Sequence, residues 1–573
     1  MSERHYIQVV VPVKLEWFPW YWSETALEQG TRVRVRLGRN VYTGFVLNDG
    51  GQPDIDPKRI QPVISVESQL ERISDEEIKL WRFIADYYLC TIGEVFKAAY
   101  PALVTEVEGK KARTKIGAIA EAENGADGGL ALKKNDEEKT GQQKRQKSLK
   151  QGCVGFPEEF AGARKKLDDD GKRAVTEILD AFDDRKTVLL QGVARQAIYD
   201  ELTRRTLEVG RDVLVLSPGA KRMSSTERRD IARLLRSEKP VAVRSSRTAV
   251  LLPFHKLGLV IIDEEQDITY KQESPAPRYN ARDVALMLAQ LQGANVVLGS
   301  AAPSLESFYN VSIGKYQYVR LLAERPHFSS ATGQQPERTG DQGMALPSDI
   351  ADNTGTGCPS GKSGALQQTG RTGKPGAGLP TDGNGNAGPK AETSTEKDFL
   401  LIDTDIEKRK NGMVGELSRV LIAEKEALEA ARKKVLVVNS WELGNISKLK
   451  LDKYALVAVL HFEFLFSRPD FRADEKAWQT LEKLKSAVKG RLVIQTANAS
   501  HPVFFGNVER MMEERKAVNL PPFTRQVIAK GRNGEILMQA CLPKDSSLPQ
   551  MKRRFLEEAS SMPGFVCVDV DPA

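Results

Sequence analysis

The sequence lacks any long apolar run. Its longest apolar stretches, such as residues 259–262 and 457–460, are interrupted within a few residues. A helix that crosses a bilayer needs about 20 consecutive apolar residues, so no membrane span is predicted. The opening residues, Met-Ser-Glu-Arg-His, contain no apolar segment of the kind that a secretory signal requires. We therefore expect a cytoplasmic protein.

Cysteine is scarce as well, and the cysteines stand singly. No two of them form a Cys-x-x-Cys pair, the spacing that structural zinc sites use. The five residues are Cys90, Cys153, Cys358, Cys541 and Cys567. A disulfide framework is equally unexpected, and no metal site is predicted.

Neither sign of charge dominates. The chain carries 84 lysines and arginines against 77 aspartates and glutamates, a formal net charge of +7. Such an excess suits a polyanionic partner, although a solvated surface of mixed charge gives the same balance. The length of 573 residues exceeds what one hydrophobic core supports, so several domains are expected.

The N-terminal part is typical of a small β-barrel followed by helix. Residues 7–13 form an apolar run, and residues 32–37 alternate arginine with apolar residues, the period of a half-buried strand. Apolar residues then recur at helical spacing from Ser74 to Ala99, where Ser74 and Glu77 offer a capping box. We predict a β-barrel-like domain with a helix over residues 1–104.

Two segments have too few apolar residues to pack. Residues 105–166 contain a basic run from Lys133 to Lys150, which predicts a flexible linker or a reduced winged-helix region whose lysines could also touch phosphates. Residues 326–396 are rich in glycine, threonine, serine and proline. This second segment is predicted to be disordered.

Strands and helices alternate on both sides of the second linker. Residues 167–325 and 397–500 contain short β-branched runs separated by amphipathic segments, the pattern of a parallel sheet covered by helices. Residues 501–573 read as a small α+β domain. The predicted strands are residues 187–191, 212–217, 241–244, 258–263, 294–300, 399–403, 435–438, 456–460 and 492–496. The predicted fold class is multidomain α/β.

The sharpest local signal is an apolar strand that ends in acids. Leu259-Val260-Ile261-Ile262 delivers Asp263 and Glu264 to the carboxyl end of the strand. A Walker B site has this geometry, with the aspartate holding Mg²⁺ and the glutamate polarising the attacking water. A strand that merely ends in exposed acids would look the same.

Longer stretches resemble the PriA family of replication-restart helicases. Residues 257–316 are similar to it through the Asp263-Glu264-Glu265-Gln266 box, the aromatic-rich loop that follows, and the box from Gly299 to Ser307. Further segments resemble the family in the same order, namely residues 30–39, 83–101, 247–254, 468–475, 501–503, 520–525 and 568–572. The resemblance implies a 3′-end-binding domain, two RecA-like helicase lobes, the second one reduced, and a C-terminal domain.

The chain departs from the family at the phosphate-binding loop. Where the family has G-x-x-x-x-G-K-T, this sequence reads Gln191-Gly192-Val193-Ala194-Arg195-Gln196. A phosphate loop works by wrapping phosphates in backbone N–H groups beside a lysine. Gly192 and Arg195 are therefore degenerate counterparts, and Arg195 could supply charge without the loop geometry.

Other family features are altered too. Gln266 replaces the histidine of the acidic box, and Ala302 replaces the threonine of the following box. The family's arginine-finger segment is not recognisable near residues 483–491, a loss that would lower the rate by about 10³ to 10⁵. The family's zinc-binding cysteines are absent after Trp441. The family uses ATP, Mg²⁺ and Zn²⁺, but no cofactor is expected here, and we expect no ATPase activity.

The N-terminal domain offers one set of DNA contacts. Strand alternation places Arg32, Arg34 and Arg36 on one face, which suits a phosphate track, although an edge strand guarded by charge looks alike. The resemblance to the family's 3′-end pocket adds Tyr21, Gly38 and Arg39. Aromatic residues nearby could stack a terminal base or dock another protein domain: Trp17, Phe18, Trp20, Tyr21 and Trp22.

The aromatic-rich loop offers a second set. It contains Tyr270, Lys271, Arg278 and Tyr279, and in the family this loop senses single-stranded DNA. Alternatively, Tyr279 packs against the first lobe.

The leading hypothesis is a PriA-like primosome component. It would bind branched DNA or single-strand/double-strand junctions at stalled forks and meet other primosome or single-strand-binding proteins, without unwinding DNA. The alternatives are an active ATP-dependent 3′ to 5′ helicase of superfamily two, and a protein-interaction scaffold that binds no DNA.

Overall fold

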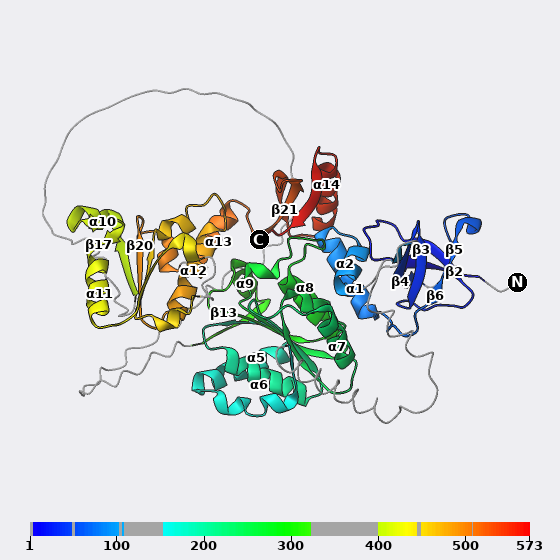
Figure 1. The fold of residues 1–573 in the computed structure, drawn as a ribbon, viewed down its shortest axis with the longest axis horizontal. Coiled ribbons are helices and arrows are strands. Elements are labelled where there is room, and N and C mark those ends of the chain that lie inside the picture. Colours follow the sequence, from blue (N-terminus) through cyan, green and yellow to red (C-terminus); the bar gives the residue numbers. More distant parts are fainter. Residues whose placement is uncertain are drawn as a thin grey trace, which may run out of the picture. The chain divides into compact units, whose positions relative to one another are not determined.

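The computed structural model describes residues 4–48, 52–101, 106–107, 153–321, 399–443, 449–506 and 508–572 (Figure 1). The predicted disorder of residues 326–396 and the basic run at 133–150 lie outside the described residues. The described chain forms a multidomain α/β protein with a curled N-terminal sheet, two largely or wholly parallel sheets and a small C-terminal sheet.

The N-terminal sheet has the strand order β5-β2-β1-β4-β3-β6, with β7 paired to β4. Its two end strands, β5 and β6, follow one another closely in the chain, and the sheet curls around a core that contains Val9, Val33 and Val35. The strands are β1 (His5–Val10), β2 (Trp20–Ser23), β3 (Arg32–Leu37), β4 (Asn40–Asn48), β5 (Gln61–Pro62), β6 (Ser65–Val66) and β7 (Glu106–Val107). A 3₁₀ turn, η1 (Pro57–Arg59), precedes β5.

The predicted helical stretch is two helices. α1 (Asp75–Tyr88) begins with the predicted capping box of Ser74 and Glu77, and it ends where Leu89 adopts a left-handed conformation with φ 52°. α2 (Ile92–Ala99) follows with a capping box of its own. The helices close over the sheet through aromatic contacts: the ring of Trp81 lies 5.6 Å from that of Phe45. Burying each such ring stabilises the fold by about 2–3 kcal/mol.

The first α/β sheet has the order β14-β9-β13-β12-β10-β11-β8, parallel except for β8. α5 and α6 pack on one face, and α7 and α8 on the other (Figure 1). The strands are β8 (Val154–Gly155), β9 (Thr187–Gln191), β10 (Asp212–Leu216), β11 (Ala242–Ser245), β12 (Leu257–Asp263), β13 (Asn295–Ser300) and β14 (Tyr316–Arg320). The helices are α5 (Asp169–Asp183), α6 (Gln196–Glu208), α7 (Ser225–Leu235), α8 (Ala281–Gln292) and α9 (Leu305–Ser312), with 3₁₀ turns η2 (Pro157–Phe160), η3 (Ala163–Lys166), η4 (Arg247–Leu251) and η5 (Ile268–Tyr270).

The second α/β sheet is smaller, with the parallel order β15-β20-β19-β18. α11 covers one face and α12 the other. Its strands are β15 (Phe399–Asp403), β18 (Val435–Asn439), β19 (Leu456–Leu460) and β20 (Arg491–Thr496), and a separate hairpin joins β16 (Met413–Val414) to β17 (Leu417–Ser418). The helices are α10 (Thr404–Lys410), α11 (Arg419–Ala430) and α12 (Ala473–Ala487), with 3₁₀ turns η6 (Ser440–Leu443), η8 (Leu451–Lys453) and η9 (Phe462–Leu465).

The C-terminal part is the small α+β unit that the sequence predicts. It comprises η10 (Pro502–Phe505), α13 (Val508–Ala517), β21 (Thr524–Gly531), β22 (Ile536–Pro543), α14 (Leu548–Ser560) and β23 (Phe565–Val570). Its strands form an antiparallel sheet of order β22-β21-β23.

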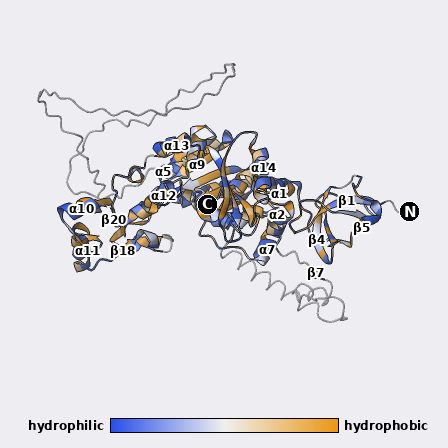
Figure 2. Ribbon diagram, turned by 90° about the horizontal axis from the view of Figure 1, so that it is seen from above, coloured by the Kyte–Doolittle hydropathy of each residue, from blue (hydrophilic) through white to orange (hydrophobic). Residues whose placement is uncertain are grey.

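Hydropathy follows this layered arrangement. In Figure 2 the helices carry both hydrophilic and hydrophobic residues, as expected for elements that pack on a sheet with one side and meet solvent with the other. Among the described residues, none of the helices combines the length and apolar character that a membrane crossing demands.

Candidate functional site

The predicted Walker B acids lie at the carboxyl edge of the first sheet. β12 is buried between β10 and β13 and ends in Asp263. Glu264 follows with a left-handed backbone, φ 50°. The side chains of Asp263 and Glu264 are 28% and 24% exposed. This edge is where ligands of open α/β sheets bind.

Arg195 fills the space in front of these acids. Its Nε and Nη2 donate to Oδ1 of Asp263 at 3.1 and 2.8 Å, and Nη2 also donates to Glu264. Its Nη1 donates to the carbonyl oxygen of Gly192. Burial by itself would lower the pKa of Arg195, but Tyr199, Asp263 and Glu264 outweigh burial and raise it. The guanidinium is thus a permanent internal cation.

Tyr199 completes this cluster. Its hydroxyl accepts a hydrogen bond from Nε of Arg195 at 3.0 Å and donates one to Oδ1 of Asp263 at 2.9 Å. Burial is the main reason that the pKa of Tyr199 is raised well above its usual value, so the hydroxyl keeps its proton. A Cβ at Gly299 would lie 1.6 Å from the Tyr199 oxygen; glycine therefore makes the space that the tyrosine occupies.

The connection from β9 to α6 is short. Only residues 192–194 precede Arg195, the N-cap of α6. The N–H of Gly192 donates to the carbonyl of Ser300 at 3.0 Å, so this amide is used within the protein. A Mg²⁺-bound triphosphate does not fit this arrangement: the turn is too short to wrap phosphates, and the Asp263 oxygen that would hold the metal is hydrogen-bonded by protein groups. We call Arg195, Tyr199, Asp263 and Glu264 the closed corner.

The segment where the family carries its arginine finger also approaches this corner. Lys483 of α12 lies 3.8 Å from Glu264 and 3.9 Å from Asp267. Arg491, by contrast, pairs with Glu424 at 3.1 Å. Across the described ranges, histidine, cysteine and acidic side chains nowhere gather in groups of three or more that could hold a metal ion.

Glu265 and Gln266, the last two residues of the acidic box, form hydrogen bonds within the protein. Glu265 is buried and accepts hydrogen bonds from the N–H and hydroxyl of Ser304, at 2.6 and 3.0 Å, and from Arg282 at 2.9 Å. Gln266 accepts from the hydroxyl of Ser300 at 2.6 Å and donates to Glu264 at 2.9 Å. The two family-like boxes are therefore joined by neutral and charged hydrogen bonds.

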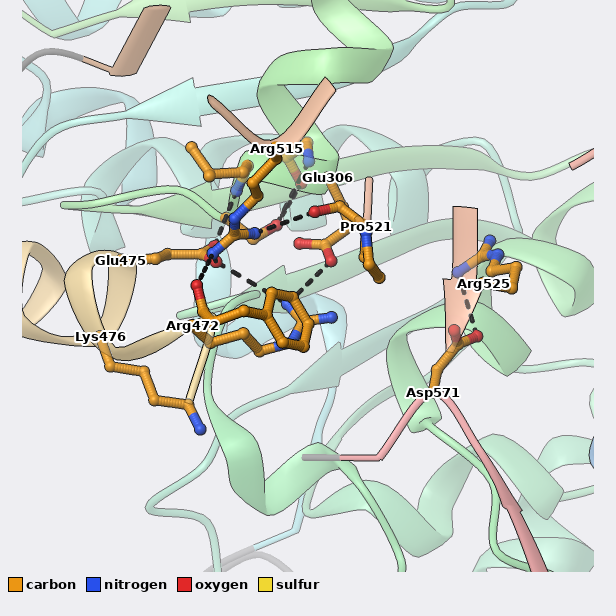
Figure 3. Close-up of polar contacts among 12 residues, drawn as sticks. Glu306, Arg472, Glu475, Lys476, Arg515, Pro521, Arg525 and Asp571 are labelled. Carbon is orange, nitrogen blue, oxygen red and sulfur yellow. Dashed lines mark hydrogen bonds and ion pairs between the residues drawn. The ribbon is translucent and has the colours of Figure 1, made fainter. Parts of the chain in front are cut away.

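A hydrogen bond and an ion pair connect α9 to the segment from Phe471 to Pro521, and a further ion pair lies within that segment. The N–H of Leu305 donates to Glu475 at 2.9 Å, Glu306 pairs with Arg472 at 2.9 Å, and Arg515 pairs with Glu475 at 2.7 Å. Figure 3 shows these side chains converging, with the Arg525–Asp571 pair beside them. Burial opposes the ionised form of Glu306, but Arg472 and Arg282 outweigh it and lower the pKa of that carboxyl.

The aromatic-rich loop is turned inward. Tyr270 and Tyr279 are buried, and Tyr270 donates to the carbonyl of Asp263 at 2.6 Å. Lys271 lies 2.8 Å from Asp569 of β23, with both side chains almost fully buried. Arg278 is half-buried. In this conformation neither tyrosine nor the lysine reaches the surface, and DNA contact by them would require the loop to open.

The arginine face of β3 is divided. Arg32 is buried, with its guanidinium 4.4 Å from the ring of Tyr100 and 5.1 Å from that of Phe96, because α2 packs over this end of the strand. Arg34 and Arg36 are half-exposed. The predicted track of three arginines therefore keeps Arg34 and Arg36 at the surface, whereas Arg32 is not accessible to DNA.

The turn that follows β3 is open. Gly38 takes a left-handed conformation, φ 62°, and both Gly38 and Arg39 are exposed. Tyr21 lies inside the sheet, where its hydroxyl donates to the carbonyl of Arg36 at 2.8 Å and burial raises its pKa to about 12. Of the aromatic cluster, Trp17 is the most exposed at 57%.

A basic pocket at the first sheet was not anticipated. It has a volume of about 290 Å³ at the carboxyl ends of β10 and β11, and its lining includes Ser217, Arg222, Ser246, Arg247 and Thr248. Sequence reasoning noted Arg247 only as part of a family-like segment and missed Arg222. The pocket could have been predicted from the sequence, because Arg222 follows the apolar run of β10 and Arg247 follows that of β11.

A curled sheet with an exposed arginine at its open turn, followed by α/β sheets, defines a multidomain α/β protein. Residues 8–101 match the family model for the PriA 3′ DNA-binding domain. Over part of its length the chain is also similar to proteins named replication restart protein PriA.

Individual relatives match over limited stretches. Replication restart protein PriA of Rickettsia felis is 35% identical over 181 residues, 27% of this chain and 27% of its own length. The Haemophilus influenzae protein of that name is 35% identical over 168 residues, 25% of this chain and 23% of its own. The Chlamydia pneumoniae protein is 55% identical over 75 residues, 13% of this chain and 10% of its own. The matched region spans about a quarter or less of the length of these relatives.

Proposed function

We propose that this protein binds branched DNA at stalled replication forks and takes part in replication restart without unwinding DNA. The observation that carries the proposal is the match of residues 8–101 to a 3′ DNA-binding domain, which supports the 3′ end of a DNA strand as the ligand. The relatives named replication restart protein PriA support the same process.

The DNA surface of this proposal runs over the open turn after β3. Gly38 lets the turn form and Arg39 is exposed at its tip, so the guanidinium can reach a phosphate without displacing protein groups. A second phosphate contact is proposed at the basic pocket of Arg222 and Arg247.

The two α/β units correspond, in this proposal, to the two RecA-like helicase lobes of the family, the second one reduced. The closed corner supports loss of the motor, because an internal guanidinium stands where Mg²⁺ and phosphates would have to bind. No resident ATP, Mg²⁺ or Zn²⁺ is proposed. Other restart proteins and single-strand-binding proteins remain the proposed protein partners, in the cytoplasm.

Fork binding is tested by fluorescence anisotropy with a labelled fork whose nascent strand ends in a free 3′ hydroxyl at the branch. Affinity should fall steeply between two salt concentrations, because phosphate contacts release counterions. A fork with a 3′ phosphate at the same position should bind more weakly. Arg39→Ala should reduce the salt slope by about one, whereas Arg229→Ala, an exposed arginine of α7, should not. If binding is absent or does not depend on salt, the proposal is wrong, and the alternative of a protein-interaction scaffold that binds no DNA is favoured.

The active-helicase alternative is tested by steady-state ATP hydrolysis with and without the fork. We expect the same background for the parent and for Glu264→Gln. Hydrolysis that the fork stimulates in the parent, and that Glu264→Gln abolishes, would show a working motor and overturn this part of the proposal.

A further inference from the structure

The carboxyl edge of the second sheet ends in aromatic turns. β18 runs into η6 and β19 runs into η9. These turns place Trp441, His461 and Phe464 together at the edge where open α/β sheets bind their ligands. We call these three residues the Trp441 patch.

The rings of the Trp441 patch contact one another but stay open to solvent. Trp441 stacks on His461 with centroids 5.7 Å apart and an interplanar angle of 17°, and Phe464 lies 5.7 Å from Trp441. Trp441 is 54% and Phe464 51% exposed. Large aromatic side chains left exposed next to each other mark interaction sites more often than single exposed residues do.

Carboxylates surround this patch. Nε2 of His461 lies 3.6 Å from Glu416 and its Nδ1 3.6 Å from Glu463, so acids stand on both sides of the imidazole. Glu442 is exposed beside Trp441. In the part of the chain that the structure describes, no lysine or arginine forms an ion pair with these three glutamates.

The charge decides what the patch can bind. Nucleic acid would bring phosphates toward three carboxylates, an unfavourable approach. A guanidinium is attracted both by the open face of an indole and by carboxylates at its edge, and it stacks on aromatic rings as an ammonium does not. We propose that the Trp441 patch docks a segment of another protein that carries arginine between apolar residues. The site is separate from the DNA surface and does not depend on it.

The test uses the full chain labelled with 5-fluorotryptophan. It contains six tryptophans, and the ¹⁹F resonance of Trp441 is assigned by its loss in Trp441→Phe. The probe is an acetylated, amidated peptide, Leu-Arg-Leu-Arg-Leu, with Leu-Glu-Leu-Glu-Leu as its charge-reversed match. The arginine peptide should shift the Trp441 resonance selectively, and the glutamate peptide should not.

Variants then separate the aromatic and acidic contributions. Phe464→Ser and the double variant Glu416→Gln/Glu463→Gln should each weaken arginine-peptide binding by about fivefold, the scale of a partly desolvated cation–π contact. Trp17→Ser, at a comparably exposed tryptophan of the N-terminal domain, should leave it unchanged. The proposal is overturned if the peptide leaves Trp441 unshifted, if the acidic double variant binds as the parent does, or if a single-stranded oligothymidylate shifts Trp441 instead.

Discussion

The two α/β sheets differ in the side chains at their carboxyl edges. At the first sheet, Arg195 pairs with the acids that end β12, and Lys271 pairs with Asp569 so that the aromatic-rich loop faces inward. At the second sheet, Trp441 and Phe464 stay exposed, and the acids beside them form no ion pair with a lysine or arginine of the described residues. One edge is closed by internal ion pairs, and the other leaves aromatic rings open to solvent.

This difference shows why fold position alone does not give function. Open parallel sheets offer a binding edge wherever their strands end, but side chains decide whether that edge is available. At the first sheet, the arginine at the start of α6 engages the acids of the edge in internal ion pairs. The predictions below test whether the first edge is closed and the second one open.

Among the changes at the ion pairs and the exposed rings of the two edges, Lys271→Met should have the largest effect. Both partners of the Lys271–Asp569 pair are almost fully buried, and removing one partner of such a pair leaves a buried charge. Lys530 still faces Asp569 at 2.8 Å, so we expect the lower part of the usual range, a loss of about 3 kcal/mol. Urea unfolding measures it. An unchanged unfolding free energy would mean that the loop is not held as described.

Arg195→Ala should cost somewhat less, about 2 kcal/mol, because water can reach the partly exposed Asp263 and Glu264. The two freed carboxylates should then bind Mg²⁺, so that millimolar MgCl₂ raises the unfolding midpoint of the variant. The parent, measured in parallel, should not respond. A parent that Mg²⁺ stabilises would contradict the closed corner.

Replacing Asp212 should have a smaller effect on stability, and its pKa determines how that effect changes with pH. Burial raises the pKa of Asp212 from 3.8 to about 6. The hydrogen bond that Asp212 accepts from the Val241 N–H at 2.9 Å lowers this pKa, but burial outweighs it. A raised folded-state pKa contributes stability that is fully present below pH 3.8 and is lost as the pH rises through about 6. Asp212→Asn should therefore gain roughly 1–2 kcal/mol over the parent at pH 7.5 and lose this advantage near pH 4. A gain that is independent of pH would contradict the assignment.

Sequence patterns located the strands well because their cause is local. The predicted runs at 187–191, 399–403 and 456–460 coincide with β9, β15 and β19, since parallel strands covered on both faces need continuous β-branched and aliphatic residues. The single helix expected from Ser74 to Ala99 was divided at Leu89. Its apolar spacing continues past the break, so periodicity alone could not reveal it.

The side-chain contacts could not be predicted in the same way, because they join distant parts of the chain. The alternating pattern predicted that Arg32 and Arg34 lie on the same exposed face. However, α2, about sixty residues later in the chain, covers Arg32 alone. Arg195 could be recognised as a stray charge, whereas its bond to Asp263 depends on the order of strands in the sheet. Lys271 was assigned to DNA, and nothing near it in sequence indicates Asp569.

The smallest effect should come from the second edge. Trp441→Ser and Phe464→Ser remove rings that are about half exposed, so little apolar surface returns to water and the unfolding free energy should change by less than about 0.5 kcal/mol each. The unfolding free energy is again measured in urea. For comparison, Phe462→Ser removes a fully buried ring of the same turn and should cost about 3–5 kcal/mol. If the Trp441 and Phe464 variants were as damaging as Phe462→Ser, the patch would be part of the core of the second sheet, and its exposed rings would not be free to bind another protein.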